Sequence, residues 1–316
     1  VYLNDKLYGM NSSGYSGRNI SIEKVKGLGH ETMPSSGLVP ITVPGTPKGW
    51  AKLNQEFGKL SLLECLTPAI NLARNGFIIS ETVGFYFERA MKIYKSRNKG
   101  EEFREFFTIF TKEDGSGYKA GDYFKSELHA YTLEQIGATN SDSFYKGELA
   151  QKIVSFMELH NGYIDASDLS EYEAEMVEPI QVNYKGYDVC EIPPNGQGIT
   201  ALMALNLLKD ESLKEGNVIT YHKQIEALKI AFSDTLKYVT DPKFMKISSN
   251  FLISDDYVKL RKKDIKDKAQ LHAPIDYKKA GTVYLATADK EGNMVSFIQS
   301  NYMGFGSGVV IDGTGI

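Results

Sequence analysis

Strand patterns stand at both ends of this 316-residue chain, and a long helical stretch separates them. Residues 1–10 resemble two short strands around a polar turn, and residues 282–288 and 294–299 resemble two more around the turn at 289–293. Helices and strands that are segregated along a chain are typical of α+β architectures. We therefore predict an α+β fold in which the first and last segments share one sheet.

The middle of the chain predicts mostly helices. Thr46 is expected to cap a helix that ends before Gly58, and the pair Ser61 and Glu64 predicts a capping box for a second helix that ends at Gly76. Further helical stretches are residues 81–108, 123–136, 143–161, 165–173, 196–208 and 221–238.

The segments between these helices predict loops and strands. Residues 11–37 show too little periodicity for a helix and are expected to form a surface loop or a cleft wall. The proline-bounded run 39–44 predicts a strand, and residues 180–184 and 187–190 predict a hairpin. Because no repeat or linker interrupts the chain, we expect a single domain over residues 1–316.

Composition excludes several classes of partner. The chain has 36 Lys and Arg against 40 Asp and Glu, so it offers no positive field for nucleic acid. No apolar run approaches the ~20 residues that span a bilayer, so we expect no membrane partner. The chain starts at Val1 without a basic, apolar leader. The absence of a visible signal peptide favours a cytoplasmic location over a periplasmic or secreted one, and we expect the true N-terminus to lie ahead of Val1.

The sequence predicts no cofactor and no metal site. Its five histidines are isolated, and its two cysteines show no CxxC spacing. The glycine-rich run 304–308 could cradle an anion, but a tight turn between strands that needs positive φ explains it better. Thr282 ordinarily would be only a good strand former. Ser300 lies on the next strand, and its hydroxyl would meet Thr282 if the two strands pair in register.

Segments spread over nearly the whole chain resemble the gamma-glutamyltranspeptidase family. The resemblance is closest to the gamma-glutamyltransferase-like branch, because Thr282 opens the run Thr-Val-Tyr-Leu. It implies an N-terminal-nucleophile hydrolase fold, a four-layer αββα sandwich, made as a precursor that cuts itself into two subunits. The matching segments are residues 43–50, 68–77, 144–147, 168–172, 184–187, 281–285, 289–293 and 300–310.

The resemblance also implies residue roles. Thr282 would be the nucleophile, would use its own α-amino group as the base, and would attack the Gly281 carbonyl during processing. Ser300 would supply a second hydroxyl, and Arg18 would clamp a substrate carboxylate. Tyr302 stands where the family usually has a polar amide that binds substrate.

The implied substrate is a small amide, a γ-glutamyl compound such as glutathione. The alternatives are an acylase or oxamate-type amidohydrolase of the same family, or a non-catalytic binding relative with this fold.

The resemblance further implies two subunits from one precursor, in a higher oligomer. Residues 1–281 would be the large-subunit part, incomplete at its N-terminus, and residues 282–316 the truncated start of the small subunit. The oxyanion-hole glycines and the residues that bind the substrate amino group are expected beyond Ile316. We also expect the junction between Gly281 and Thr282 to be cut.

Overall fold

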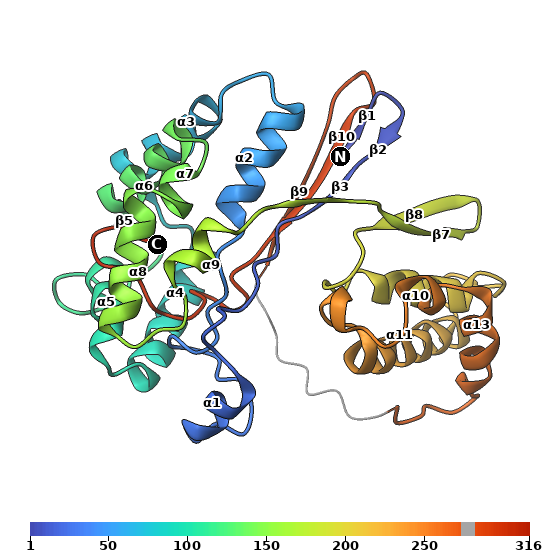
Figure 1. Ribbon diagram of the computed structural model, residues 1–316. Helices are drawn as coiled ribbons and strands as arrows, with labels where there is room; N and C mark the ends of the chain where they lie inside the picture. Colours follow the sequence, from blue (N-terminus) through green and yellow to red (C-terminus); the bar gives the residue numbers. More distant parts are fainter. Residues whose placement is uncertain (273–281) are drawn as a thin grey trace. The chain divides into compact units, whose positions relative to one another are not determined.

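The computed structural model describes residues 1–272 and 282–316 (Figure 1). Their contacts divide the chain into two compact units. Unit 1 comprises Val1–Asn11, the described part of Glu175–Lys278, and Ala286–Ser296. Unit 2 comprises Ser12–Ala174, the described part of Lys279–Leu285, and Phe297–Ile316. Two compact units can belong to one domain, so the expectation of a single domain stays a prediction.

One sheet joins the two ends of the chain. Its strand order is β2-β1-β10-β9, and β1 pairs antiparallel with β10 through Tyr2 and Met294 (Figure 1). This pairing confirms the prediction that the first and last segments share a sheet. Within this sheet β9 is an edge strand, and all of its residues are exposed. The strands are β1 Tyr2–Leu3, β2 Lys6–Leu7, β9 Val283–Ala288 and β10 Met294–Gln299.

Unit 1 is built around a buried helix. α10 is apolar on every side, as a helix is when other elements surround it, and Ile199, Leu202 and Leu207 are fully buried. It packs against α11, with Ile230 and Leu252 in the same core. Besides the shared sheet, the elements of this unit are β3 Gly9–Asn11, β6 Glu175–Val177, β7 Ile180–Tyr184, β8 Tyr187–Glu191, α10 Ile199–Leu208, α11 Val218–Tyr238, η2 Pro242–Phe244, α12 Ser249–Leu252, α13 Asp255–Arg261 and η3 Lys262–Asp264.

Unit 2 holds the helical middle of the chain. The capping box of Ser61 and Glu64 starts α3 as predicted, and Gly76 ends it. The elements are α1 Ile22–Gly27, α2 Thr46–Phe57, α3 Leu62–Asn75, β4 Phe77–Ile78, α4 Glu81–Arg97, η1 Glu101–Phe103, α5 Arg104–Phe110, β5 Tyr123–Phe124, α6 Glu127–Ala138, α7 Asp142–Tyr145, α8 Glu148–Leu159 and α9 Ala166–Ser170.

An aromatic cluster on α4 and α5 forms one of the cores of unit 2. Phe305, from the segment after β10, lies with its ring centroid 4.7 Å from that of Phe110 and 5.0 Å from that of Phe87. Phe106 lies 5.4 Å from Phe305 and is almost completely buried. Edge-to-face and tilted aromatic pairs at these distances stabilise a core beyond the effect of area alone. The cluster therefore fixes the segment that follows β10.

Three local predictions were wrong. Residues 39–44 form no strand and make a single bridge, Ser16 with Thr42, because Pro40 and Pro44 have no N–H to donate. The predicted loop 11–37 contains α1, which is one short helix capped by the Ser21 side chain. In α2 the N-cap is Gly45, and Thr46 is the first residue inside the helix.

The mixed content of helix and sheet confirms the α+β class. Across the helices of the described residues, none has the length and apolar character that crossing a bilayer requires.

Candidate active site

The β9–β10 hairpin brings two hydroxyl groups together at its open end. Thr282 directly precedes β9, and Ser300 directly follows β10. The Thr282 Oγ1 hydroxyl donates a hydrogen bond to Ser300 Oγ over 3.2 Å. Both residues are exposed. The juxtaposition expected from an in-register hairpin is therefore present, and the catalytic roles of the two residues stay predictions.

Tyr302 approaches this pair through its backbone. Its N–H donates a hydrogen bond of 2.9 Å to Ser300 Oγ. The residue has φ of 76°, a left-handed backbone conformation that residues other than Gly, Asn and Asp rarely adopt. The residue is 53% exposed.

The glycine-rich run after Tyr302 forms a tight turn, as the simpler interpretation predicts. Gly304, Gly306 and Gly308 all have positive φ, and the Gly306 N–H donates to the Met303 carbonyl over 2.7 Å. Gly308 could not carry a side chain, because a Cβ there would lie 2.4 Å from Asn98 Nδ2. The turn does not join two strands, since residues 309–316 form none.

Two aromatic residues that the sequence did not single out support the site. The indole Nε1–H of Trp50, on α2, donates a hydrogen bond of 3.1 Å to Gln299 Oε1 at the end of β10. The Tyr94 hydroxyl, on α4, lies 2.9 Å from the Gly306 carbonyl oxygen. No local pattern gives either residue a role at this site, because their partners lie more than two hundred residues along the chain.

Arg18 forms hydrogen bonds with residues in α9 and directly after it. Its guanidinium donates to Glu171 over 2.5 Å and to Ser167 Oγ over 3.1 Å, and its backbone N–H donates to the buried Asp168 carboxylate over 3.2 Å. The hydrogen bond with Glu171 raises the pKa of Arg18. In the part of the chain that the structure describes, neither Thr282 nor Ser300 is among the partners of Arg18. Its role as a carboxylate clamp stays a prediction.

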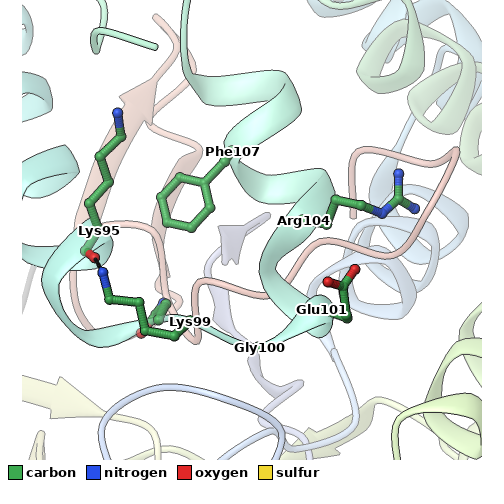
Figure 2. A pocket seen from close by; sticks show the side chains of 7 residues that line it. Lys95, Lys99, Gly100, Glu101, Arg104 and Phe107 are labelled. Carbon is green, nitrogen blue, oxygen red and sulfur yellow. Dashed lines mark hydrogen bonds between the residues drawn. The ribbon is translucent and has the colours of Figure 1, made fainter.

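A pocket of about 440 Å³ lies between the end of α4 and α5 (Figure 2). Figure 2 shows the Phe107 ring beside it, with Lys95, Lys99 and Arg104 around its rim. These cationic groups donate hydrogen bonds to oxygen atoms of the protein itself. Lys99 donates to the Lys95 carbonyl, Lys95 to the Gly115 carbonyl, and Arg104 to the Asp312 carboxylate. The seven residues that line the pocket include none of the predicted site residues.

Gly281 lies outside the described residues, and so does the junction between Gly281 and Thr282. The predicted processing role of Gly281 and the expected cut stay predictions. Among residues 1–272 and 282–316, no three His, Cys, Asp or Glu side chains gather as a metal site would require.

Comparison with known proteins shows similarity along the whole chain. Residues 1–316 match the family described as Gamma-glutamyltranspeptidase. The Glutathione hydrolase-like YwrD proenzyme of Bacillus subtilis (strain 168) is 35% identical, over 98% of this chain and 58% of the relative. The Acylase ACY 1 proenzyme of Pseudomonas sp. (strain SE83) is 32% identical, over 89% of this chain and 50% of the relative.

A solved structure shows the same similarity in three dimensions. The cephalosporin acylase from Bacillus halodurans is 46% identical and superposes with a TM-score of 0.95, over 100% of this chain and 58% of that chain. The chain thus spans between half and three fifths of the length of these relatives. The agreement of sequence motifs, family match and structure shows that the chain belongs to the gamma-glutamyltranspeptidase family.

Proposed function

We propose that this chain carries the nucleophile of a self-cleaving amidohydrolase or acyltransferase, and that Thr282 is that nucleophile. The observation that carries the proposal is the 3.2 Å hydrogen bond between Thr282 Oγ1 and Ser300 Oγ, in a family whose relatives include proenzymes. Structural hydroxyls in strands usually serve packing or solvation. Two of them joined at the end of a hairpin, with a backbone N–H directed at the second, form a polarised pair.

The chemistry would proceed in two stages. In the precursor, Thr282 Oγ would attack the carbonyl of residue 281, and the peptide bond ahead of Thr282 would be replaced by an ester that water then hydrolyses. The freed α-amino group, with a reference pKa of about 7.7–8.0, could then accept the Oγ proton. Thr282 Oγ would attack a substrate amide carbon, the protonated amine would leave, and water or an acceptor amine would release the acyl group.

For the substrate we propose an acyl amide, with an acyl group that need not be γ-glutamyl. Tyr302 carries an aromatic ring at the position where the family resemblance places a polar amide. The acylase relatives, at 32% and 46% identity, support this class. The glutathione hydrolase-like relative, at 35% identity, supports γ-glutamyl compounds as the second candidate. The four-layer αββα sandwich and a two-subunit mature protein belong to the same proposal.

Intact-mass measurement of the full-length protein tests the nucleophile assignment. We expect a fragment that begins at Thr282. A single species that stays uncut on long incubation would instead support a non-catalytic relative with this fold.

Comparison of kcat/KM for γ-glutamyl, glutaryl and oxamyl anilides tests the substrate class. We expect slower turnover of the γ-glutamyl compound than of at least one other acyl anilide. Equal or faster use of the γ-glutamyl compound would show that another residue supplies the contact that Tyr302 lacks.

A further inference from the structure

One side-chain hydroxyl from α4 bonds to two carbonyl groups of the turn after Ser300, in addition to the aromatic packing of Phe305. The Tyr94 hydroxyl lies 2.9 Å from the Gly306 carbonyl oxygen and 3.3 Å from the Met303 carbonyl oxygen. Both carbonyls belong to the turn that follows Tyr302. One phenol proton is thus directed at both ends of that turn.

The Tyr94 ring is itself fixed. It stacks on Phe106 with a centroid distance of 5.1 Å and an interplanar angle of 25°, and it meets the Phe305 ring edge-on at 6.1 Å. A Cβ on Gly308 would come within 2.6 Å of the Tyr94 ring, so this glycine allows the backbone to lie directly against it. Burial raises the pKa of Tyr94, and the hydroxyl therefore keeps its proton and remains a donor at neutral pH.

The Met303–Gly306 turn directly follows Tyr302 and determines the backbone conformation of that residue. A left-handed conformation at a residue other than glycine is strained and persists only where its surroundings impose it. This conformation, with φ of 76°, accompanies the 2.9 Å bond from the Tyr302 N–H to Ser300 Oγ. Ser300 Oγ also accepts the proton of the Thr282 hydroxyl.

We propose that Tyr94 is a positioning residue for the Thr282–Ser300 pair. Its hydroxyl fixes the Met303–Gly306 turn, and the turn holds the Tyr302 N–H on Ser300 Oγ. The proposal rests on the proposed function, because Thr282 must be the nucleophile for the position of Ser300 to affect turnover. Tyr94 touches neither Thr282 nor Ser300 in the described structure, so its effect would pass through the backbone.

Tyr94→Phe tests the proposal, since it removes the hydroxyl and keeps the ring. In the full-length protein, with an acyl anilide that the wild type hydrolyses, we expect kcat to fall about five- to tenfold, the effect of one lost hydrogen bond. KM should change by less than about twofold. The matched control is Tyr118→Phe, in the same aromatic cluster, where the Tyr118 ring packs 5.6 Å from Phe87.

Two outcomes would overturn the proposal. One is a Tyr94→Phe variant whose kcat stays within about twofold of wild type. The other is a Tyr118→Phe variant that loses as much, which would show a general effect of packing. If the wild type neither cleaves itself nor hydrolyses any anilide, the proposed function fails first, and that result is separate from either outcome.

Substitution of Tyr302 tests the backbone step independently. Asn tolerates the left-handed region, whereas a β-branched residue strongly resists it. We therefore expect kcat of Tyr302→Asn to exceed that of Tyr302→Val by about tenfold, whatever the two variants do to KM. Equal kcat values would show that the conformation of residue 302 does not affect the reaction.

Discussion

The family resemblance assigns the Thr282–Ser300 end of the hairpin and the Arg18 loop to one site. In the structure, Thr282 and Ser300 contact each other, whereas Arg18 contacts other residues. The two hydroxyls meet at 3.2 Å because one strand pairing controls both. Arg18 extends from an irregular loop and binds Glu171 and Ser167. A residue next to the end of a paired strand is positioned by the strand register. A residue on an irregular loop is positioned only by the contacts of that loop.

The contacts of Arg18 are nevertheless weak enough to exchange. Its side chain is 50% exposed and that of Glu171 is 60% exposed, so water screens their ion pair and the pair contributes little to stability. A substrate carboxylate that offered a bidentate partner could displace Glu171 at little cost. The Arg18 loop is therefore a region that binding could rearrange.

Replacement of Thr282 by Ala should have the largest effect on this comparison. Self-cleavage and amide hydrolysis should both disappear, because the attacking oxygen is gone while the strand remains. Thr282→Ser is the matched control and should retain part of each activity. Gel and mass analysis of the full-length variants measures both, and normal cutting of Thr282→Ala would show that the nucleophile is another residue.

The pH dependence should separate the two regions next. If the Thr282 α-amino group is the base, kcat/KM should fall about tenfold for each pH unit below ~7.7, because the protonated amine cannot accept a proton. Arg18 keeps its charge throughout, since Glu171 raises its pKa further. A rate that stays flat from pH 6 to 8 would contradict the assignment of the base.

Ser300→Ala should have a smaller effect. Thr282 keeps its own base, and the loss is one hydrogen bond to the nucleophile, so we expect kcat to fall about tenfold. Ser296→Ala, four residues earlier on β10, is the control and should leave kcat unchanged. If Ser300→Ala retained full kcat, the hypothesis that Ser300 assists Thr282 would be wrong.

Arg18→Lys should give the smallest change. A point charge cannot replace a planar fork, so KM should rise about threefold while kcat stays near wild type, if Arg18 binds a substrate carboxylate. The control is Arg104→Lys, whose arginine is similarly exposed and pairs with Asp312 at 2.6 Å. Unchanged KM in both variants would remove Arg18 from the site and leave it as a support for α9.

Short-range patterns explain what the sequence could predict. Ser61 and Glu64 stand three residues apart, and both partners of the capping box are therefore visible in the sequence. The pairing of Thr282 with Ser300 required only the register of one hairpin. The strand predicted at residues 39–44 does not form, because Pro40 and Pro44 have no N–H to donate to a neighbouring strand.

Long-range contacts explain what the sequence could not predict. Tyr94 and its partner Gly306 are 212 residues apart in the sequence. The left-handed backbone of Tyr302 could not be predicted, because the residue at that position is not glycine. Arg18 likewise meets Glu171 across 153 residues. These contacts depend on how helices and loops pack, which no local pattern encodes.

The place of Thr282 directly ahead of β9 has a consequence for the proposed self-cleavage. Thr282 lies just outside the first residue of β9, and β9 is hydrogen-bonded to β10. A cut ahead of Thr282 would break one covalent link and leave every rung of that ladder in place. After the cut, the pairing of β9 with β10 would keep Thr282 in place. The new N-terminus would therefore form in its final position.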